Sequence, residues 1–539
     1  MSAFAAALLL CAPLAASAAA AAPPHIIFVV GDDVGANDLG ARNGGRTQTP
    51  TLDGLIAEGI TLTDYYAFKI CSPSRASMLT GRYPWGAGFY DMSNDGDHTT
   101  TNFTLFPELL RGAGYATAAL GKWDAGSALR SATPTYRGFD TFLGYYYACQ
   151  ADYFYHAVPP GNACLEYNAS TVDFSDNAGT ALAPARVANG TYSRSLLSDR
   201  AAAIIAAHDA ATPLFMYAAF HNAHEACLNM TTQGVQAPLA TVQLYANTTL
   251  DTHKIAGAMT TELDLGVAAI VAALRARGMY DNTLLVFVSD NGGPLDHSSN
   301  YPLRGGKHTF YEGGVRVEAF VSGGALPAAR RGSSWRGLAH AADWFATLVE
   351  GAAGAAIAPG STGGPRPLDS LNLWPALLAG GASPRGEVVI QVNNSYFSEN
   401  CSVIRVGEMK LIRGDPGDSR TVAWPPTGDA PVPLGRSGGV LEPGTDHVRG
   451  SELAGGVVPG RCRPHCLYNL SADVGEQVDL ARQPGYAALA RALAARLDAA
   501  GAEGPPHAYI WPPQHYHQVV QKQLCDIANQ LGTVEPADY

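Results

Sequence analysis

The chain is 539 residues long, with 47% hydrophobic residues and a formal net charge of −12 at pH 7. This length and apolar content can bury a large core in two or more domains, which excludes a disordered tail protein. The negative charge argues against a nucleic-acid backbone or an anionic membrane surface as the main partner. Any anion that the protein binds must therefore be held locally.

Residues 1–22 are predicted to be a signal peptide. An apolar run from Ala5 to Leu10 is followed by Ala-rich sequence that ends before Pro23, and its small residues offer cleavage sites. No Lys or Arg precedes the run, so a wrongly assigned start or an N-terminal anchor is the alternative. No later stretch is expected to span a bilayer. We expect a secretory route that leads outside the cell, to the cell-wall or periplasmic space, or to a lysosome-like compartment.

Eight Asn-x-Ser/Thr sequons also fit a secretory route, although single sequons are common by chance. They are Asn102, Asn168, Asn189, Asn229, Asn247, Asn393, Asn400 and Asn469.

Four apolar runs each end in polar side chains. Unbroken Val, Ile, Leu and Phe runs are typical of buried parallel strands, and open α/β sheets bind ligands at the carboxyl ends of their strands. The helical spacing from Lys254 to Arg277 predicts a helix that covers these strands. We therefore predict an α/β fold with a large, mixed or parallel, doubly wound sheet and helices on both faces. The runs are His25 to Val30 before Asp32 and Asp33, Tyr115 to Leu120 before Lys122, Leu214 to Phe220 before His221 and His224, and Leu284 to Ser289 before Asp290 and Asn291.

The segment from Cys71 to Arg82 (CSPSRASMLTGR) predicts a short helix with a cysteine at its start. Proline suits a first helical turn because its missing N–H costs nothing there, and Gly81 can close the other end. Free amides at the start favour an anion. A thiol, two hydroxyls and the Arg75 guanidinium at one place suit a nucleophile that holds sulfate or phosphate. The alternative is a buried cysteine beside an ordinary helix cap.

The residue composition of the sequence changes in its C-terminal part. The stretch from Gly351 to Pro367 is rich in Gly, Ala and Pro, which predicts a loop or a domain connection. We expect a smaller antiparallel sheet beyond it with one packed helix. A long insertion or loop is expected at 415–461. These patterns predict a larger domain at 23–366 and a smaller α+β domain at 367–539. The predicted elements of the smaller domain are strands within Glu387 to Val392 and Ser402 to Arg413, and a helix from Gly485 to Ala500.

Nine cysteines must be placed. Cys11 lies in the signal peptide and Cys71 in the candidate site, which leaves an odd number, so one thiol is expected to stay free. Spacing does not fix the connectivity of the others, and a zinc site at Cys462 and Cys466 is disfavoured because no second ligand pair lies nearby. The candidate disulfides are Cys149 with Cys164, and Cys401 with Cys462 or Cys466.

The string from Cys71 to Arg82 resembles, without a gap, the signature of type I sulfatases. The resemblance runs from about His25 to Ala481 and is strongest to the arylsulfatase B (N-acetylgalactosamine-4-sulfatase) branch. It implies an alkaline-phosphatase-like fold and oxidation of Cys71 to formylglycine (3-oxoalanine) by a formylglycine-generating enzyme. It also implies that the aldehyde hydrates to a diol, one hydroxyl of which attacks sulfur before the other expels sulfate. The further matching segments are Arg137 to Asp140, Asp343 to Leu348, Ser383 to Arg385, Val406 to Leu411 and Leu467 to Leu480.

Oxygen ligands at two predicted strand ends suit calcium or magnesium. For either dipeptide alone a solvated turn is the better interpretation, but both pairs follow strands. The resemblance implies that they bind the metal, Ca²⁺ with Mg²⁺ as the lesser alternative, and that modified Cys71 and the sulfate complete the shell. Such a cation would acidify a diol hydroxyl and polarise a sulfate oxygen. The four ligands are Asp32, Asp33, Asp290 and Asn291.

Four further side chains match positions that contact sulfate or the aldehyde in that family. Each of them alone would be an ordinary surface or hydrogen-bonded residue. Fixed cations in a poorly hydrated site stabilise charge on the leaving oxygen and the sulfuryl oxygens, by roughly 3 kcal/mol each. His224 is the predicted general acid for the leaving group, and His221 is the alternative. The four are Arg75, Lys122, Lys307 and His224.

One position departs from the family pattern. Sulfatases typically have Gly-Lys-Trp-His where this chain has Asp124 after Trp123, and the resemblance implies that this histidine takes the proton from the diol. Aspartate is a weaker base, because its ordinary pKa of about 3.9 lies below the value of about 6.5 for histidine. Asp124 therefore predicts a slower or acid-shifted enzyme, and an inactive one is the harsher alternative.

The leading prediction is a sulfuric ester hydrolase, dependent on formylglycine and calcium, that acts on a sulfated glycan or an aryl sulfate. A phosphodiesterase or phosphonate hydrolase of the same fold is the second hypothesis, and a non-catalytic glycan-binding relative is the third. An aromatic cluster could stack on a sugar ring, although core packing explains it equally well. Its members are Tyr145, Tyr146, Tyr147, Tyr153, Phe154 and Tyr155.

Overall fold

A computed structural model of the chain describes residues 22–89, 99–127, 129–146, 152–156, 173–179, 181, 185, 190–226, 235–248, 251–364, 366–392, 401–421 and 462–503. Several predictions fall outside these ranges. They are most of the signal peptide, the Cys149–Cys164 disulfide, Tyr147, most of the 415–461 insertion, and the sequons at Asn168, Asn189, Asn229, Asn393 and Asn400.

The larger of two sheets is mixed, as predicted. Its strands are β1 (His25–Gly31), β2 (Ile60–Tyr66), β3 (Ala116–Lys122), β4 (Thr141–Tyr145), β5 (Ser175–Ala178), β6 (Leu214–Ala219), β7 (Thr283–Ser289), β8 (Ala319–Ser322) and β9 (Ser333–His340). They lie in the order β5-β4-β3-β6-β1-β7-β8-β2-β9. All neighbours are parallel except at β5 and β8. The four predicted apolar runs form β3, β6, β1 and β7, which lie side by side at its centre.

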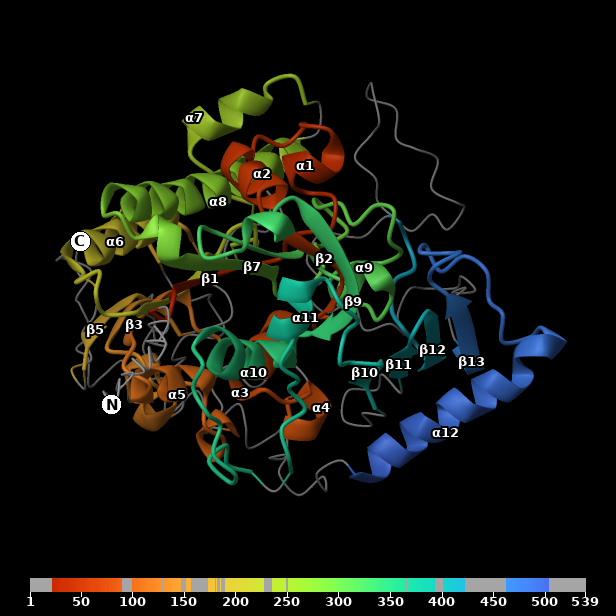
Figure 1. The fold of residues 1–539 in the computed structure, drawn as a ribbon. Helices are drawn as coiled ribbons and strands as arrows, with labels where there is room; N and C mark the ends of the chain where they lie inside the picture. The colour runs from red at the N-terminus through yellow and green to blue at the C-terminus, as the bar shows by residue number, and fades with distance from the viewer. Residues whose placement is uncertain are drawn as a thin grey trace, which may run out of the picture.

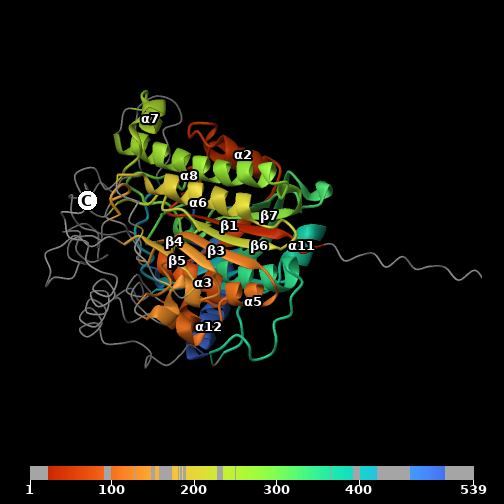
Figure 2. The same cartoon turned by 90° about the vertical axis from the view of Figure 1, so that its left-hand side faces the viewer.

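Helices cover both faces of this sheet (Figures 1 and 2). The α-helices between residues 40 and 379 are α1 (Gly40–Asn43), α2 (Pro50–Ala57), α3 (Cys71–Thr80), α4 (Pro84–Ala87), α5 (Phe106–Gly112), α6 (Ser193–Ala207), α7 (Leu239–Val242), α8 (Asp251–Ala276), α9 (Glu312–Val315), α10 (Trp344–Ala346) and α11 (Trp374–Ala379). Alternate residues of β1 enter different cores: Ile27 packs in the core formed with α2, α6 and α8. Phe28 packs in the core formed with α3, α5, α10 and α11. The doubly wound arrangement therefore follows from a central strand that is apolar on both faces.

Helix α8 confirms the predicted covering helix and corrects one expectation about membranes. Its segment His253–Ala276 is long and apolar enough to span a bilayer, with a mean hydropathy of 1.5 in its most apolar window. However, 72% of that window is buried inside the molecule. Leu263 and Val267 pack in the same core as β1, β6 and β7. The apolar composition of this helix is therefore that of a core element.

The smaller sheet lies beside the larger one (Figure 1). Its strands are β10 (Glu387–Gln391), β11 (Ser402–Val406), β12 (Met409–Gly414) and β13 (Cys462–Asn469), and each neighbouring pair is antiparallel. Helix α12 (Ala487–Glu503) packs on it through Ala490, Leu493 and Leu497. This confirms the predicted antiparallel sheet with one helix. The domain boundary after residue 366 stays a prediction, because Leu373 and Leu377 still pack in the core of the larger sheet.

The cysteines of β13 correct the predicted disulfide. Cys462 and Cys466 are bonded to each other, with their Cα atoms 4.9 Å apart. The predicted bond from Cys401 to Cys462 or Cys466 is therefore wrong, and a zinc site at this pair is excluded as well. The strand is irregular here, since its pairing with β12 shifts register between Ile412 and Gly414. Such a bulge brings the two thiols together, and cysteine spacing does not reveal it.

A buried charge cluster joins the two sheets. Lys410 Nζ on β12 lies 2.9 Å from a carboxylate oxygen of Glu312 at the start of α9 and 2.9 Å from one of Glu476. All three side chains are buried. Burial, partly offset by Lys410, raises the pKa of Glu476 to about 7. The hydroxyl of Tyr66 donates to Glu312 over 2.7 Å, so α9 is anchored both to the larger sheet and to the smaller one.

Substituting Lys410→Met should lower the free energy of unfolding by about 3–5 kcal/mol, because two buried carboxylates would lose their shared cation. The matched control on the same strand is Arg413→Met. Its ion pair with Asp498 is partly exposed, with side chains 32% and 64% accessible, and should contribute less than about 1 kcal/mol. Guanidinium unfolding followed by intrinsic fluorescence measures both. Equal losses in the two variants would contradict this assignment of the cluster.

Candidate active site

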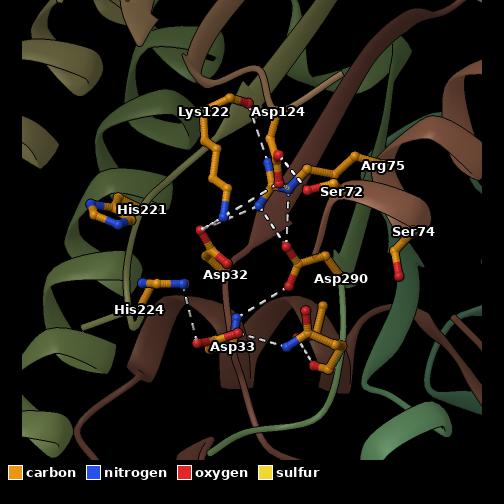
Figure 3. A network of polar contacts seen from close by, with 12 residues as sticks. Asp32, Asp33, Ser72, Ser74, Arg75, Lys122, Asp124, His221, His224 and Asp290 are labelled. Carbon is orange, nitrogen blue, oxygen red and sulfur yellow. Dashed lines mark hydrogen bonds and ion pairs between the residues drawn. The ribbon is translucent and has the colours of Figure 1, made fainter. Parts of the chain in front are cut away.

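The polar residues after the central strands meet at one edge of the larger sheet (Figure 3). Strands β1 and β7 are paired up to Gly31, which brings Asp32 beside Asp290. The backbone N–H of Asp33 donates to Asp290 Oδ1 over 3.2 Å, and the amide of Asn291 donates to Asp33 Oδ1 over 2.6 Å. All four side chains are buried. The structure thus brings the four predicted metal ligands together.

The donor set fits a hard cation. Ligand atoms of Asp32, Asp33 and His224 all lie within 4.8 Å of one another. Within the described part of the chain, Asp32 Oδ1 and Asn291 Oδ1 are buried and have no hydrogen-bond donor. Burial raises the pKa of Asp32 and that of Asp290. The charge of Asp33 raises the pKa of Asp32 further, and the charge of Asp32 raises that of Asp290. Buried oxygens that lack donors, on carboxyls that resist ionisation, are what an oxygen-preferring divalent cation would stabilise.

Cys71 is the first residue of α3, as predicted, and Gly81 ends that helix with φ of 68° and a bond to Ser77. The thiol is fully buried. Burial, followed by the charge of Asp124, raises its pKa well above the ordinary value. Since the thiolate is the nucleophilic form, an unmodified Cys71 would react poorly.

The two hydroxyls of the α3 motif do not both face the site. Ser72 Oγ donates to Asp124 over 2.6 Å. Ser74 Oγ instead accepts from the backbone N–H of Phe68 over 2.9 Å and lies 3.0 Å from the carbonyl oxygen of Ile70. Ser74 therefore fixes the turn that enters α3, away from the charged groups (Figure 3).

Arg75 and Lys122 each pair with a predicted metal ligand. Arg75 Nε and Nη2 lie 3.0 and 2.7 Å from Asp290 Oδ2, and its Nη1 donates to the Lys122 carbonyl over 3.2 Å. Lys122 Nζ donates to Asp32 over 2.9 Å. All of these side chains are buried, so each charge is balanced locally.

The residue before Lys122 must be glycine for steric reasons. Gly121 has φ of +87°, and a Cβ atom there would lie 1.9 Å from the carbonyl oxygen of Ala219 on β6. A larger residue would push β3 away from β6, and Lys122 would move away from Asp32.

His224 and Lys307 form a hydrogen-bonded pair. His224 Nδ1 lies 2.7 Å from the Glu225 carbonyl oxygen and must donate to it. Its Nε2 therefore accepts from Lys307 Nζ at 2.9 Å, while Lys307 also donates to Asp33 over 2.7 Å. Burial and the nearby lysine ammonium groups lower the pKa of His224 to about 3. His221 is fully buried and contacts none of these charged groups by hydrogen bond, which places His224 rather than His221 against the cations.

Asp124 lies inside the same cluster in a left-handed backbone conformation, with φ of 50°. Its backbone N–H donates to the Tyr146 carbonyl over 3.2 Å. Its carboxylate accepts from Ser72 and lies 3.6 Å from Lys122 Nζ and 3.9 Å from Arg75 Nε. Aspartate and histidine are both enriched in this backbone region, so the position suits either residue.

Most of the predicted aromatic cluster is core. Tyr145, Tyr146 and Tyr153 are buried, whereas Tyr155 is 60% exposed. Ring stacking of Tyr153 on His221 was not predicted from the sequence, because a tyrosine in an irregular segment gives no periodic signal.

The chain is similar to a known protein family and to several curated proteins. The family model described as Sulfatase matches residues 24–355. Arylsulfatase J of Mus musculus is 32% identical over 86% of this chain and 73% of its own length. N-acetylgalactosamine-6-sulfatase of Sus scrofa is 30% identical over 67% of each chain.

Two solved structures share the fold. Ps i-CgsB in complex with k-i-k-neocarrahexaose has a TM-score of 0.69 at 22% identity, over 95% of this chain and 100% of its own. The PsFucS1 sulfatase from Pseudoalteromonas sp. has a TM-score of 0.65 at 22% identity, over 90% of this chain and 91% of its own.

Proposed function

Since this chain belongs to the sulfatase family, we propose that it hydrolyses sulfate esters of glycans or aryl alcohols. The observation that carries the proposal is the position of Cys71 at the start of α3, beside three buried cations and four buried carboxylates. The likeness to N-acetylgalactosamine-6-sulfatase supports a sugar sulfate as substrate. The arylsulfatase B branch and the natural ester stay predictions.

Residue 71 supplies the nucleophile in this proposal. As 3-oxoalanine it would provide, after hydration, a hydroxyl for attack on sulfur and a second one for the release of sulfate. A fully buried residue cannot be reached by a modifying enzyme in the folded protein, so a formylglycine-generating enzyme would act before folding is complete. The predicted signal peptide places that step in the secretory route.

Asp32, Asp33, Asp290 and Asn291 would hold one divalent cation, for which their buried oxygens are suited. We propose Ca²⁺ rather than Mg²⁺, because an irregular set of carboxylate and amide oxygens fits its flexible coordination. Such a cation would polarise a sulfate oxygen and acidify a hydroxyl on residue 71.

The chain's own cations would bind and orient the sulfate. Without a metal, the buried carboxylates of the site outnumber its three buried cations by one charge. The carboxylates are Asp32, Asp33, Asp124 and Asp290, and the cations are Arg75, Lys122 and Lys307. A divalent cation would reverse that sign and match a singly charged sulfate ester. We place the proton for the leaving oxygen on the Lys307–His224 pair, in which His224 Nε2 accepts from the ammonium group.

Asp124 is the proposed base that takes a proton from residue 71 when sulfate is expelled. Its hydrogen bond with Ser72, the neighbour of residue 71, supports this role. Its ion pairs with Lys122 and Arg75 hold the carboxylate in the charged form that a base requires.

Peptide mass spectrometry across Cys71 tests the modification, in protein made by a host that has a formylglycine-generating enzyme. We expect the aldehyde or its hydrate together with hydrolysis of 4-nitrophenyl sulfate, and Cys71→Ala should lose several orders of magnitude in kcat. Faster hydrolysis of bis(4-nitrophenyl) phosphate would select the phosphodiesterase hypothesis. An aldehyde without turnover of either ester would select the non-catalytic one.

Calcium should raise the melting temperature of the protein. A ligand that binds only the folded state at a concentration 100 times its Kd contributes about 2.7 kcal/mol. Asp32→Asn should abolish most of the shift between EDTA and CaCl₂. Asp418→Asn, at a carboxylate that is 40% exposed in a surface ion pair, is the control and should keep it. The metal assignment fails if the wild-type protein shows no shift or if Asp32→Asn retains it.

Substituting Asp124→His should raise kcat for 4-nitrophenyl sulfate at pH 7 by up to about tenfold, because histidine is the better base near neutrality. Asp124→Asn keeps an acceptor for Ser72 but removes the base, and should lower kcat. Steady-state kinetics across pH measure both variants. Unchanged or lower turnover in the histidine variant would count against Asp124 as the base.

A further inference from the structure

Four buried aromatic rings form a continuous stack that ends at His224. Tyr192 stacks on Tyr153 at 5.0 Å between ring centroids and an interplanar angle of 12°. Tyr153 stacks on His221 at 4.6 Å and 14°, and His221 stacks on His224 at 5.2 Å and 28°. Figure 3 shows the two histidines one above the other beside Lys122 and Asp33. The stack fixes the plane of the His224 ring from one side.

The hydroxyl of Tyr153 fixes the backbone that carries this ring. It lies 2.8 Å from the carbonyl oxygen of His221 and 2.8 Å from that of His224, so its proton is shared between the two ends of one turn. The amide of Asn222 in the same turn donates to the Tyr192 hydroxyl over 2.9 Å. Two members of the stack therefore hold the turn through both their rings and their hydroxyls.

The same turn is joined to a predicted metal ligand. The backbone N–H of Asp32 donates to the Asn222 carbonyl over 3.1 Å, and the N–H of Ala223 donates back to the Asp32 carbonyl over 2.6 Å. A displacement of the turn would therefore move His224 relative to Lys307 and would disturb Asp32 as well.

His221 contributes a ring rather than a hydrogen bond. Both of its nitrogens are buried without a hydrogen-bond partner among the described residues. Leaving buried polar groups unsatisfied costs about 1–3 kcal/mol each. A ring that is retained at this cost, between Tyr153 and His224, acts through its stacking surface.

We propose that Tyr153 and His221 are positioning residues that hold His224 Nε2 against Lys307 Nζ, so that the ammonium group of this pair faces the leaving-group oxygen. The consequence for catalysis rests on the proposed function, since it assumes that the His224–Lys307 pair supplies the proton. Protonation matters most when the leaving group is a poor one, so misplacement of His224 should slow esters of weakly acidic alcohols more than esters of acidic phenols.

The kinetic experiment compares 4-nitrophenyl sulfate, which has a good leaving group, with 4-methylphenyl sulfate, which has a poor one. Tyr153→Phe keeps the ring and removes the hydroxyl. We expect kcat for the methylphenyl ester to fall by about tenfold or more, against less than about threefold for the nitrophenyl ester, with KM unchanged. Equal losses on both esters would show a merely structural role and overturn the proposal, as would no loss at all.

Two variants at residue 221 separate the ring from its nitrogens. His221→Ala removes the stacking surface and should show the same leaving-group-dependent loss. His221→Phe restores the surface and should recover most of the methylphenyl rate. A phenylalanine variant as slow as the alanine variant would mean that the imidazole nitrogens act, which contradicts the proposal. Tyr245→Phe is the control, because it also removes a buried hydroxyl that is hydrogen-bonded, to Gln48 N–H over 2.8 Å.

A second measurement does not depend on turnover. Long-range ¹H–¹⁵N spectra of histidine-labelled protein report the tautomer of His224, here neutral and protonated at Nδ1 because that atom donates to the Glu225 carbonyl. In a Cys71→Ala background, Tyr153→Phe should shift or average this signature, and His221→Phe should keep it. An unchanged signature in Tyr153→Phe overturns the positioning role. If the expected shift is seen but the protein with Cys71 intact hydrolyses no sulfate ester, the proposed function alone is refuted.

Discussion

The site depends on burying seven charged side chains at the ends of parallel strands, where no bulk water can solvate them. Such groups persist only when each has a partner of opposite charge at close range. The pairs Arg75–Asp290, Lys122–Asp32 and Lys307–Asp33 meet that condition at 2.7 to 2.9 Å. The fourth carboxylate, Asp124, shares two of the same cations. Removing a member of any of the three close pairs would leave its partner as an unpaired buried charge, so the fold of this edge depends on the charged groups of the site.

The smaller sheet supports this edge from a distance. Gly313 N–H on α9 donates to the Arg304 carbonyl over 2.7 Å, and a Cβ atom at Gly313 would lie 2.3 Å from the carbonyl oxygen of Gly305. The loop that carries Lys307 therefore packs directly on α9 with no room for a side chain. Since Glu312 begins α9 and is bound by Lys410 of β12, the position of Lys307 is set in part by the C-terminal strands.

The residues that follow the central strands could be predicted from the sequence to lie together. Contacts made by residues in irregular backbone segments could not. Asp32 and Asn291 follow continuous apolar runs, and parallel strands bring their carboxyl ends to one edge, so their proximity was predictable. Strands β2, β8 and β9, which lie on one side of the sheet, were not predicted because β8 is short and the apolar residues of β2 and β9 are interrupted by polar ones. The Cys462–Cys466 bond and the Tyr153 stack lie on a bulged strand and an irregular segment, where spacing along the chain does not report distance in space.

Asp124 changes the charge balance of the site, in addition to its proposed role as the base. If a neutral histidine stood there, the three remaining carboxylates would balance the three cations, and a bound divalent ion would leave two positive charges. With Asp124 charged, the same ion leaves one. One positive charge matches the single negative charge of a sulfate ester and of a phosphodiester, but it is too small for a doubly charged phosphate monoester. Charge therefore favours monoanionic esters as a class. The choice between sulfur and phosphorus then depends on the residues around residue 71 and on those proposed to protonate the leaving oxygen.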